Sequence, residues 1–247
     1  MSIGKEFFEK TRISHLSEPA QRKGVPQPPL EQPIPDDITR LPLPDPSSIK
    51  IPAMDLRTAM EQRSSLRKYS QNELSLDELS YLLWITQGVK SISDRPVTFR
   101  TVPSAGSRHA LETYMLINRV DGLTPGLYRY SAIKHFIFSV SLEVGINERM
   151  TTACNNQSHV RTSAATFFWV ADMERMTWRY SERAYRYVLL DAGHVCQNFY
   201  LAAESLQCGA CAIAAYDDDL LNAALGVDGE SMVTIYGATI GKRGVEN

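Results

Sequence analysis

The chain has 247 residues, of which 26 are Lys or Arg and 28 are Asp or Glu, giving a net charge of −2. Hydrophobic residues make up 43% and charged residues 22%, which is the composition of an ordinary globular protein. This balance excludes a collagen, an extended coiled coil, a fully disordered chain and a small disulfide-rich protein. It also argues against a dedicated nucleic-acid or anionic-membrane binder.

The N-terminal segment differs from the rest in its proline content, since ten of the thirteen prolines lie in residues 1–52. Proline lacks a backbone donor and biases the residue before it toward extended geometry. Apolar residues such as Phe7, Leu30 and Leu41 recur in this segment, although a free linker has little use for them. We therefore expect residues 1–52 to form an extended arm packed on the compact body, residues 53–247, or on a second subunit.

Hydrophobic periodicity and capping signals predict the secondary structure of the body. The expected elements, in chain order, are a helix over 53–63, a helix opened by the capping box Ser75–Glu78 and ended near Gly88, an irregular loop over 89–104, strands over 113–120 and 135–140, a helix over 142–153, a buried central strand over 164–171, a core helix over 182–206, a helix over 217–225 and a strand over 233–240. Because helices and strands mix without strict βαβ alternation, this order favours an α+β layered fold.

Cysteine usage and targeting signals indicate a reducing compartment. No apolar stretch approaches the ~18 residues of a membrane span, and the N-terminus lacks the apolar core of a secretory signal. The C-x-x-C spacing of Cys208 and Cys211 leaves a redox motif or half a zinc site open. Because no second pair follows and the five histidines show no metal spacing, we favour buried free thiols and expect no metal, no membrane partner and a cytoplasmic protein.

Motifs of self-sufficient catalysis are missing from the sequence, which contains no H-E-x-x-H, G-x-S-x-G or G-x-G-x-x-G. An enzyme without its own reactive set often uses a cofactor. The segment Arg63–Arg67 closes the first predicted helix with two guanidiniums, on one side if the helix continues, and two hydroxyls between them. Such a set suits a phosphate monoester, although a solvated helix end remains open. Small-residue segments at 103–107 and 209–215 permit close approach to a ligand, or simply form a turn and tight packing.

Several separated stretches, taken in this order, resemble the FMN-dependent nitroreductase family, and more narrowly its branch of SagB-type, thiazole-oxidase-like dehydrogenases. They are RSSLRKYSQNELSLDELSYLLWITQG (63–88), VPSAGSRHALETYMLI (102–117), GLYRY (126–130), AYRYVLLDAGHVCQNFYLAAESLQCGA (184–210) and IYGATIGK (235–242). The resemblance implies a three-layer fold with a central, mostly antiparallel sheet flanked by helices. It also implies an intertwined homodimer with FMN at the subunit interface, so residues 53–247 would be the FMN-binding domain.

The resemblance also implies roles for individual residues. The residues that it assigns to the phosphate of FMN are Arg63, Ser64, Ser65 and Arg67, assisted by Lys242 or Arg243. The residues that it assigns to a loop reaching the flavin from the partner subunit are Pro103, Ser104, Ala105 and Gly106. The side-chain amide of Gln157 would contact the pyrimidine edge of the flavin. The residues that it places against the isoalloxazine ring are Ile213, Ala214 and Ala215, with a backbone N–H near Ala214 donating to flavin N5.

The implied activity is a two-electron oxidoreductase that transfers hydride through flavin N5, in ping-pong order, on a small organic or peptide-derived substrate. Two alternatives remain open. One is a reductase of nitro compounds or quinones with NAD(P)H as a transient donor. The other is a non-catalytic flavin-binding subunit of a peptide-modifying complex.

The catalytic candidates are Tyr180, as a substrate-facing proton donor, and its neighbour Arg179. They stand where azoline-oxidising relatives carry Lys-Tyr, and a guanidinium is a poor proton acceptor, which argues against azoline oxidation. Four arginines recur at helical spacing, and they are Arg175, Arg179, Arg183 and Arg186. Two interpretations remain open: the four form a solvated helix face, or one of them points toward the flavin and orients an anionic substrate. His194, in the middle of the predicted core helix, is expected to be a core histidine.

Overall fold

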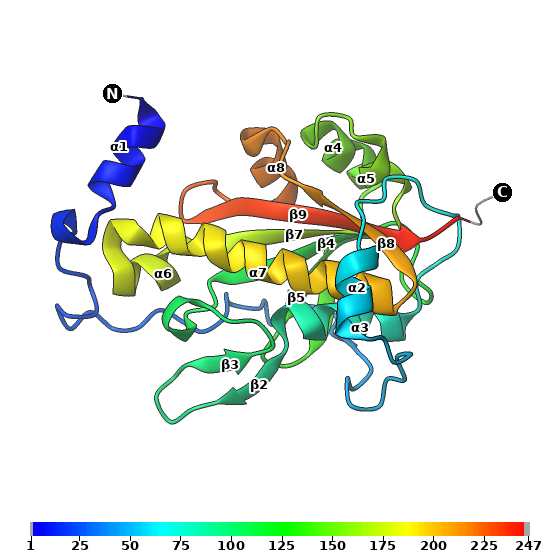
Figure 1. The fold of residues 1–247 in the computed structure, drawn as a ribbon, viewed down its shortest axis with the longest axis horizontal. Helices are drawn as coiled ribbons and strands as arrows, with labels where there is room; N and C mark the ends of the chain where they lie inside the picture. The colour runs from blue at the N-terminus through cyan, green and yellow to red at the C-terminus, as the bar shows by residue number, and fades with distance from the viewer. Residues whose placement is uncertain (1, 245–247) are drawn as a thin grey trace.

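A seven-stranded sheet organises the chain, and the computed structural model describes residues 2–244 of it (Figure 1). Every pair of neighbouring strands in this sheet is antiparallel. The order across the sheet is β1 (Leu41–Pro42), β6 (Phe136–Ser141), β5 (Gly126–Ser131), β4 (Leu111–Ile117), β7 (Ala165–Asp172), β9 (Met232–Lys242) and β8 (Cys208–Ile213). A separate two-stranded hairpin pairs β2 (Val89–Ile92) with β3 (Thr98–Arg100).

Helices cover both faces of the sheet, which confirms the expected three-layer α+β fold (Figure 1). The helices on one side are α2 (Leu56–Gln62), α3 (Leu76–Gln87), α6 (Met173–Tyr180) and α7 (Ala184–Ser205), and those on the other are α4 (Ile146–Ala153), α5 (Ser158–Thr162) and α8 (Asp218–Leu225). Strand β7 serves both layers, because alternate side chains point to opposite faces. Phe167 and Trp169 enter the core under α7, whereas Phe168 and Val170 enter the core under α4 and α8.

Local signals placed several elements correctly. The capping box of Ser75 and Glu78 forms at the start of α3, and Gly88 is the C-terminal cap of that helix. Gly226, with a φ of 74°, ends α8 in the left-handed region that favours glycine. The apolar run near 164–171 is β7, which is buried throughout and lies inside the sheet.

Four strands of the body were not anticipated. The region expected to be an irregular loop holds the hairpin β2–β3, and the link between two predicted strands holds β5. The small-residue run CGACAI, expected as a loop, is the edge strand β8. In each case the strand is short or lacks the alternation of apolar and polar residues on which a sequence-based assignment depends.

Helix α7 is buried on one face only, so the expectation of a core helix is wrong for its other face. Val188, Val195 and Phe199 are buried, but Leu189 and Leu190 are 53% and 60% exposed. His194 is also exposed, which overturns its assignment as a core histidine. A single surface helix buries one stripe of its circumference, and the near-continuous apolar run of this sequence extends beyond that stripe.

Residues 2–52 are mostly without regular structure, and after the part nearest the N-terminus, which projects past α6, they run along the body (Figure 1). A helix, α1 (Ile3–Lys10), forms in the part that precedes the first proline, where nothing prevents helical backbone. Farther on, the backbone N–H of Gln21 donates to the carbonyl of Trp178 at 2.8 Å, and the Trp178 indole donates to the carbonyl of Val25 at 2.8 Å. The division of the chain at residue 52 stays a prediction.

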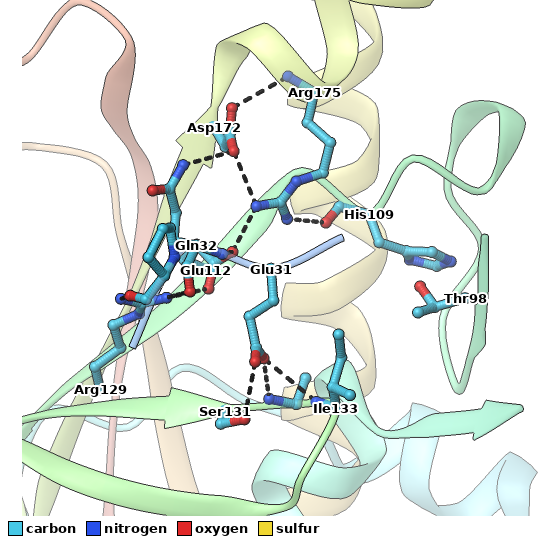
Figure 2. A network of polar contacts seen from close by, with 12 residues as sticks. Glu31, Gln32, Thr98, His109, Glu112, Arg129, Ser131, Ile133, Asp172 and Arg175 are labelled. Atoms are coloured by element: carbon cyan, nitrogen blue, oxygen red, sulfur yellow. Dashed lines mark hydrogen bonds and ion pairs between the residues drawn. The ribbon is translucent and has the colours of Figure 1, made fainter. Parts of the chain in front are cut away.

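A buried ionic network ties the sheet, α6 and the N-terminal segment together (Figure 2). The guanidinium of Arg175 lies 2.7 Å from Glu112 and 2.9 Å from Asp172, and Arg129 lies 3.3 Å from the other oxygen of Glu112. Gln32 completes the network, since its backbone N–H donates to Glu112 at 3.0 Å and its side chain to Asp172 at 2.7 Å. Arg175 is 1% exposed, so the expectation of a solvated face is wrong for this arginine.

Two carboxyl groups in this region have shifted pKa values of opposite sign. Burial raises the pKa of Glu31, and the nearby charge of Glu112 adds to that effect. Burial also opposes ionisation of Glu112, but the charges of Arg175 and Arg129 outweigh it and leave the pKa of Glu112 below its ordinary value. Glu112 is therefore the anion around which the buried cations are arranged.

We expect Glu112→Gln to destabilise the fold by about 3 kcal/mol, because it leaves buried guanidiniums without their carboxylate. The loss should be complete above the pKa of an unfolded glutamate and should shrink as the pH falls through the lowered folded value, since Glu112 then becomes neutral as well. Denaturant unfolding at several pH values measures this difference. The same substitution at Glu143, which makes an exposed pair with Arg149, should cost little at any pH.

Candidate functional site

The segment Arg63–Arg67 lies along the edge of the sheet in extended conformation. Helix α2 ends at Gln62, and Arg63 caps it with φ −51° and ψ 122°. Beyond the cap, Ser65 forms a parallel bridge with Ala210 of β8, and the backbone N–H of Leu66 donates to the carbonyl of Ala210 at 2.8 Å. The two arginines therefore project from an extended strand rather than from one side of a continued helix.

Two glycines in the sheet allow this close approach. A Cβ on Gly209 would lie 2.1 Å from Cδ2 of Leu66, and a Cβ on Gly241 would lie 2.9 Å from Cδ1 of Tyr69. The Tyr69 hydroxyl then bonds both the carbonyl of Leu66 and the hydroxyl of Thr239, each at 2.7 Å. The position of Arg63–Arg67 thus depends on the absence of side chains at 209 and 241.

Tyr200 of α7 connects the arginine segment to the end of β8. Its hydroxyl lies 3.0 Å from Oγ of Ser65 and accepts the backbone N–H of Ala212 at 2.7 Å. The guanidinium of Arg63 lies over its ring, 5.3 Å from the centroid. Tyr200 was not among the candidates, because the sequence does not say which face of α7 meets residues 63–67.

Gln157 adds a further predicted residue to the same edge. Its amide donates to the carbonyl of Ala215 at 2.7 Å and to that of Cys154 at 2.9 Å. Ala214 and Ala215, directly after β8, are exposed, whereas Ile213 is buried in the core beneath α4 and α8. The edge therefore brings together eight of the predicted residues: Arg63, Ser64, Ser65, Arg67, Gln157, Ile213, Ala214 and Ala215.

The charge of this edge is positive and uncompensated. Within residues 2–244, the side chains of Arg63 and Arg67 make no ion pair and no hydrogen bond. Burial is the main cause of a lowered pKa for His159, and the nearby charge of Arg67 is the second cause. The imidazole therefore adds no charge to this edge at neutral pH. Two guanidiniums, with the exposed side chain of Ser64 and the Ser65 hydroxyl that Tyr200 also contacts, are a donor set that fits a phosphate group.

Lys242 and Arg243, in contrast, are already paired. Lys242 makes an ion pair with Glu78, and Arg243 contacts both oxygens of Glu204 at 2.6 and 2.8 Å. Their carboxylate partners come from α3 and α7, far away in the sequence, and the spacing of basic residues along β9 gives no hint of them. These two side chains therefore bring no free charge to the edge.

The loop Pro103–Gly106 lies elsewhere, beside the first half of α7. The backbone N–H of Ala105 donates to Asp191 at 3.2 Å, and the Ser104 hydroxyl accepts the backbone N–H of His109 at 2.9 Å. Asp191 precedes Tyr200 by nine residues, about 14 Å along the helix axis. Within one chain, this loop and the arginine segment are therefore held apart along α7.

Arg179 and Tyr180 join the loop at Gly106. This glycine has a φ of +56°, and a Cβ there would lie 2.3 Å from the Tyr180 hydroxyl and 2.9 Å from Nε of Arg179. Tyr180 also packs edge-on against Tyr187, with ring centroids 4.8 Å apart. The remaining arginines of the helical stripe bind the N-terminal segment: Arg183 donates to the carbonyl of Thr11 and Arg186 to that of Phe8.

Cysteines take no part in either group. All four are buried and free, and burial raises the pKa of Cys154, Cys196 and Cys208 to about 12. In the described part of the chain, no group of three or more His, Cys, Asp or Glu side chains is placed to hold a metal ion. Within residues 2–244, none of the helices has the length and apolarity needed to cross a membrane.

Comparison with known proteins gives the family. The sequence profile of the nitroreductase family matches residues 60–242. This chain belongs to the nitroreductase family. The match spans both groups of predicted residues, from the arginine segment to the end of β9.

Two individual proteins are similar to this chain in sequence. The chain is 33% identical to the nitroreductase homologue MJ1384 of Methanocaldococcus jannaschii, over 74% of this chain and 87% of that protein. It is 29% identical to the trifolitoxin-processing protein TfxB of Rhizobium leguminosarum bv. trifolii, over 55% of this chain and 38% of TfxB. The chain thus spans well under half of TfxB.

Solved structures show the same fold. A nitroreductase homologue from Anabaena variabilis superimposes with a TM-score of 0.70 at 27% identity, over 85% of this chain and 42% of that one. A homologue from Desulfovibrio desulfuricans, solved in complex with FMN, gives a TM-score of 0.55 at 17% identity, over 77% of this chain and 87% of that one.

Gly209→Ala should destabilise the protein by about 1–3 kcal/mol, because the added Cβ overlaps Leu66 and forces the arginine segment away from the sheet. Thermal unfolding measures the loss. Gly4→Ala is the matched control, since Gly4 lies in a helix with no atom within 4 Å of the added carbon. Equal melting temperatures for the two variants would show that the approach at Gly209 is not tight.

Proposed function

We propose that this chain is an FMN-dependent two-electron oxidoreductase of the SagB-type branch, acting on a small organic or peptide-derived substrate. One observation carries the proposal: Arg63 and Arg67 lie beside two serine hydroxyls, without any carboxylate partner in the described chain, on the segment that pairs with the edge strand β8. Unpaired guanidiniums at such a position are suited to the phosphate of a cofactor. The Desulfovibrio homologue, which binds FMN, supports that choice of cofactor.

The residues of this chain would then have separate tasks. Bound FMN supplies the two-electron chemistry. Arg63 and Arg67 hold its phosphate, Ala214 and Ala215 offer backbone without bulky side chains to its ring, and Gln157 lies at the same edge beside Ala215. Tyr180 is the proposed proton donor to the substrate, and Arg179 orients the substrate by charge.

We propose further that two copies of the chain build each site together. The outward face of α7 exposes Leu189 and Leu190, and the neighbouring helix α2 exposes Leu56 and Met60. Exposed apolar patches of this kind mark interfaces. A second copy packed on this face offers its loop 103–106 to the arginine segment, which one chain holds too far from its own loop.

The substrate class has support from one relative. TfxB, named for the processing of trifolitoxin, aligns over 55% of this chain. This similarity favours a peptide-derived substrate and the SagB-type branch over a general reductase. The alternative reductase would take its electrons from NAD(P)H, and the non-catalytic alternative predicts bound FMN without turnover.

The purified protein should be yellow, with the visible absorption of oxidised flavin, and should bind added FMN after the flavin is stripped. Arg63→Ala and Arg67→Ala should each weaken FMN binding by roughly tenfold or more, because each removes charge-assisted hydrogen bonds to the phosphate. Titration by flavin fluorescence measures the affinity. Arg149→Ala, an exposed arginine on α4, is the control that keeps full affinity.

A colourless protein that does not bind added FMN would falsify the proposal. Rapid mixing with NADPH then separates its versions, since bleaching of the flavin identifies the reductase. Lack of bleaching by NADPH together with reduction by a substrate identifies the dehydrogenase.

Leu189→Glu and Leu190→Glu should convert the proposed dimer to a monomer, because each buries a charge at the interface. Light scattering after size-exclusion chromatography measures the mass. Val144→Glu, at a fully exposed position after β6, should leave the mass unchanged. If the wild-type chain is a monomer that nevertheless binds FMN, the shared-site proposal is wrong and the cofactor proposal stands.

A further inference from the structure

A groove of about 570 Å³ opens beside Gly106. Three parts of the chain enclose it: the β2–β3 hairpin, the loop at 106–108 and the end of α6, while Gln21 and Gln27 of the N-terminal segment close its rim. Its volume is in the range of sites that hold small organic ligands. None of the described residues that line it is Asp or Glu.

Arg108 is the buried charge in this groove. The residue is only 2% exposed, and its Nη1 is fully buried without a hydrogen-bond partner in the described structure. Its Nε makes one long contact, 3.3 Å, to the carbonyl of Gly106, and its guanidinium lies 5.3 Å from the ring of Trp178. A buried guanidinium with an unused donor is costly, and an oxyanion is the partner that removes the cost.

Arg179 brings a second guanidinium to the same place. It is exposed at the end of α6, forms no ion pair within residues 2–244 and lies over the ring of Tyr180 at 5.7 Å. Burial, and then the charge of Arg179, lowers the pKa of Arg108, as expected for two cations without an anion between them. Arg95, on the hairpin, adds a third positive charge to the lining.

Hydrogen bonds from several elements hold the residues around Arg108 in place. Trp178, which lies against Arg108, makes two hydrogen bonds with the N-terminal segment: its carbonyl accepts the backbone N–H of Gln21, and its indole donates to the carbonyl of Val25. Arg175 donates to the carbonyl of His109 at 3.0 Å and so fixes the backbone directly after Arg108. The site is therefore built from packed elements and is not a chance meeting of surface side chains.

We propose that Arg108 and Arg179 form an oxyanion-binding site that takes the carboxylate or phosphate of a ligand with an apolar body. The apolar body would lie against Pro96, Val97 and Phe99 of the hairpin. Two guanidinium groups can share one oxyanion through parallel N–H donors. Because none of the described lining residues is acidic and three are arginines, the groove favours an anion over a neutral or cationic ligand.

The relation of this site to catalysis rests on the proposed function. Gly106 belongs both to the groove and to the loop expected to reach the partner's flavin, so a ligand anchored at Arg108 would extend toward the reacting centre. Anion binding itself requires only the two arginines. The two proposals are therefore tested apart.

The test is a binding titration on the full-length protein, with and without FMN, at constant ionic strength. The probes are phenyl phosphate and phenylacetate, with 2-phenylethanol as a neutral analogue of the same shape. Titration calorimetry measures affinity, and tryptophan fluorescence reports on Trp178 beside Arg108. We expect saturable binding of at least one anion and roughly tenfold or more weaker binding of the alcohol. The tighter of the two anions identifies the group that the site prefers.

Three variants locate the site. Arg179→Gln changes an exposed residue and should weaken anion binding by roughly tenfold without unfolding the protein. Arg108→Gln should weaken it at least as much, and circular dichroism checks its fold. Arg149→Gln removes the same charge on α4 and should leave binding unchanged.

Equal affinity for the anions and the alcohol overturns this proposal, and so does full anion affinity in Arg179→Gln. If FMN binds but the anions do not, the oxyanion site is wrong and the flavin proposal stands. If the anions bind through Arg108 and Arg179 to a protein without affinity for FMN, the flavin proposal fails and the oxyanion site stands.

Discussion

The ionic contact of Arg175 with Glu112 and Asp172 is the interaction on which the functional half of the molecule depends. Arg175 lies in the first turn of α6, Glu112 in β4 and Asp172 at the end of β7. By also binding the carbonyl of His109, the same guanidinium fixes the chain that leads from the loop 103–108 into the sheet. The positions of Trp178, Arg179 and Tyr180 relative to that loop follow from this one buried cation. Burying an ion pair is costly, and here five hydrogen-bonding groups around Glu112 and Asp172 offset the cost.

A second constraint places the other half of the proposed site. The arginine segment reaches the sheet only because β8 and β9 carry glycine at 209 and 241. Small residues at this edge are thus required for the packing of the arginine segment. The same lack of bulky side chains suits the flat cofactor that we propose. Within one chain, the two halves lie about two and a half turns of α7 apart. The proposal that two copies build each site rests on this separation and on the exposed apolar face of α7.

Sequence reasoning predicted the fold class and the elements that carry strong local signals, such as the capping box of α3 and the apolar run of β7. It missed β5 and β8, whose short or small-residue sequences lack a clear period. For the candidate site, spacing singled out the two arginines, but their extended conformation depends on contacts with residues almost 150 positions away. The pairing of Lys242 with Glu78 and of Arg243 with Glu204 was beyond reach for the same reason. Arg108 was not predicted, because a single arginine forms no sequence pattern and only its burial in the structure distinguishes it.

The contacts of the N-terminal segment have a consequence for how the chain reaches its native state. Gln32 bonds Asp172 across 140 residues, and Gln21 bonds Trp178 across an even longer stretch. During synthesis this segment emerges before the surface that receives it, which is made of β4, β7 and α6. Contacts of such long sequence separation are slow to form, because the chain between them must already be folded to bring the ends together. The segment therefore docks as a late step of folding, and the groove beside Arg108 acquires its rim only when the rest of the molecule is complete.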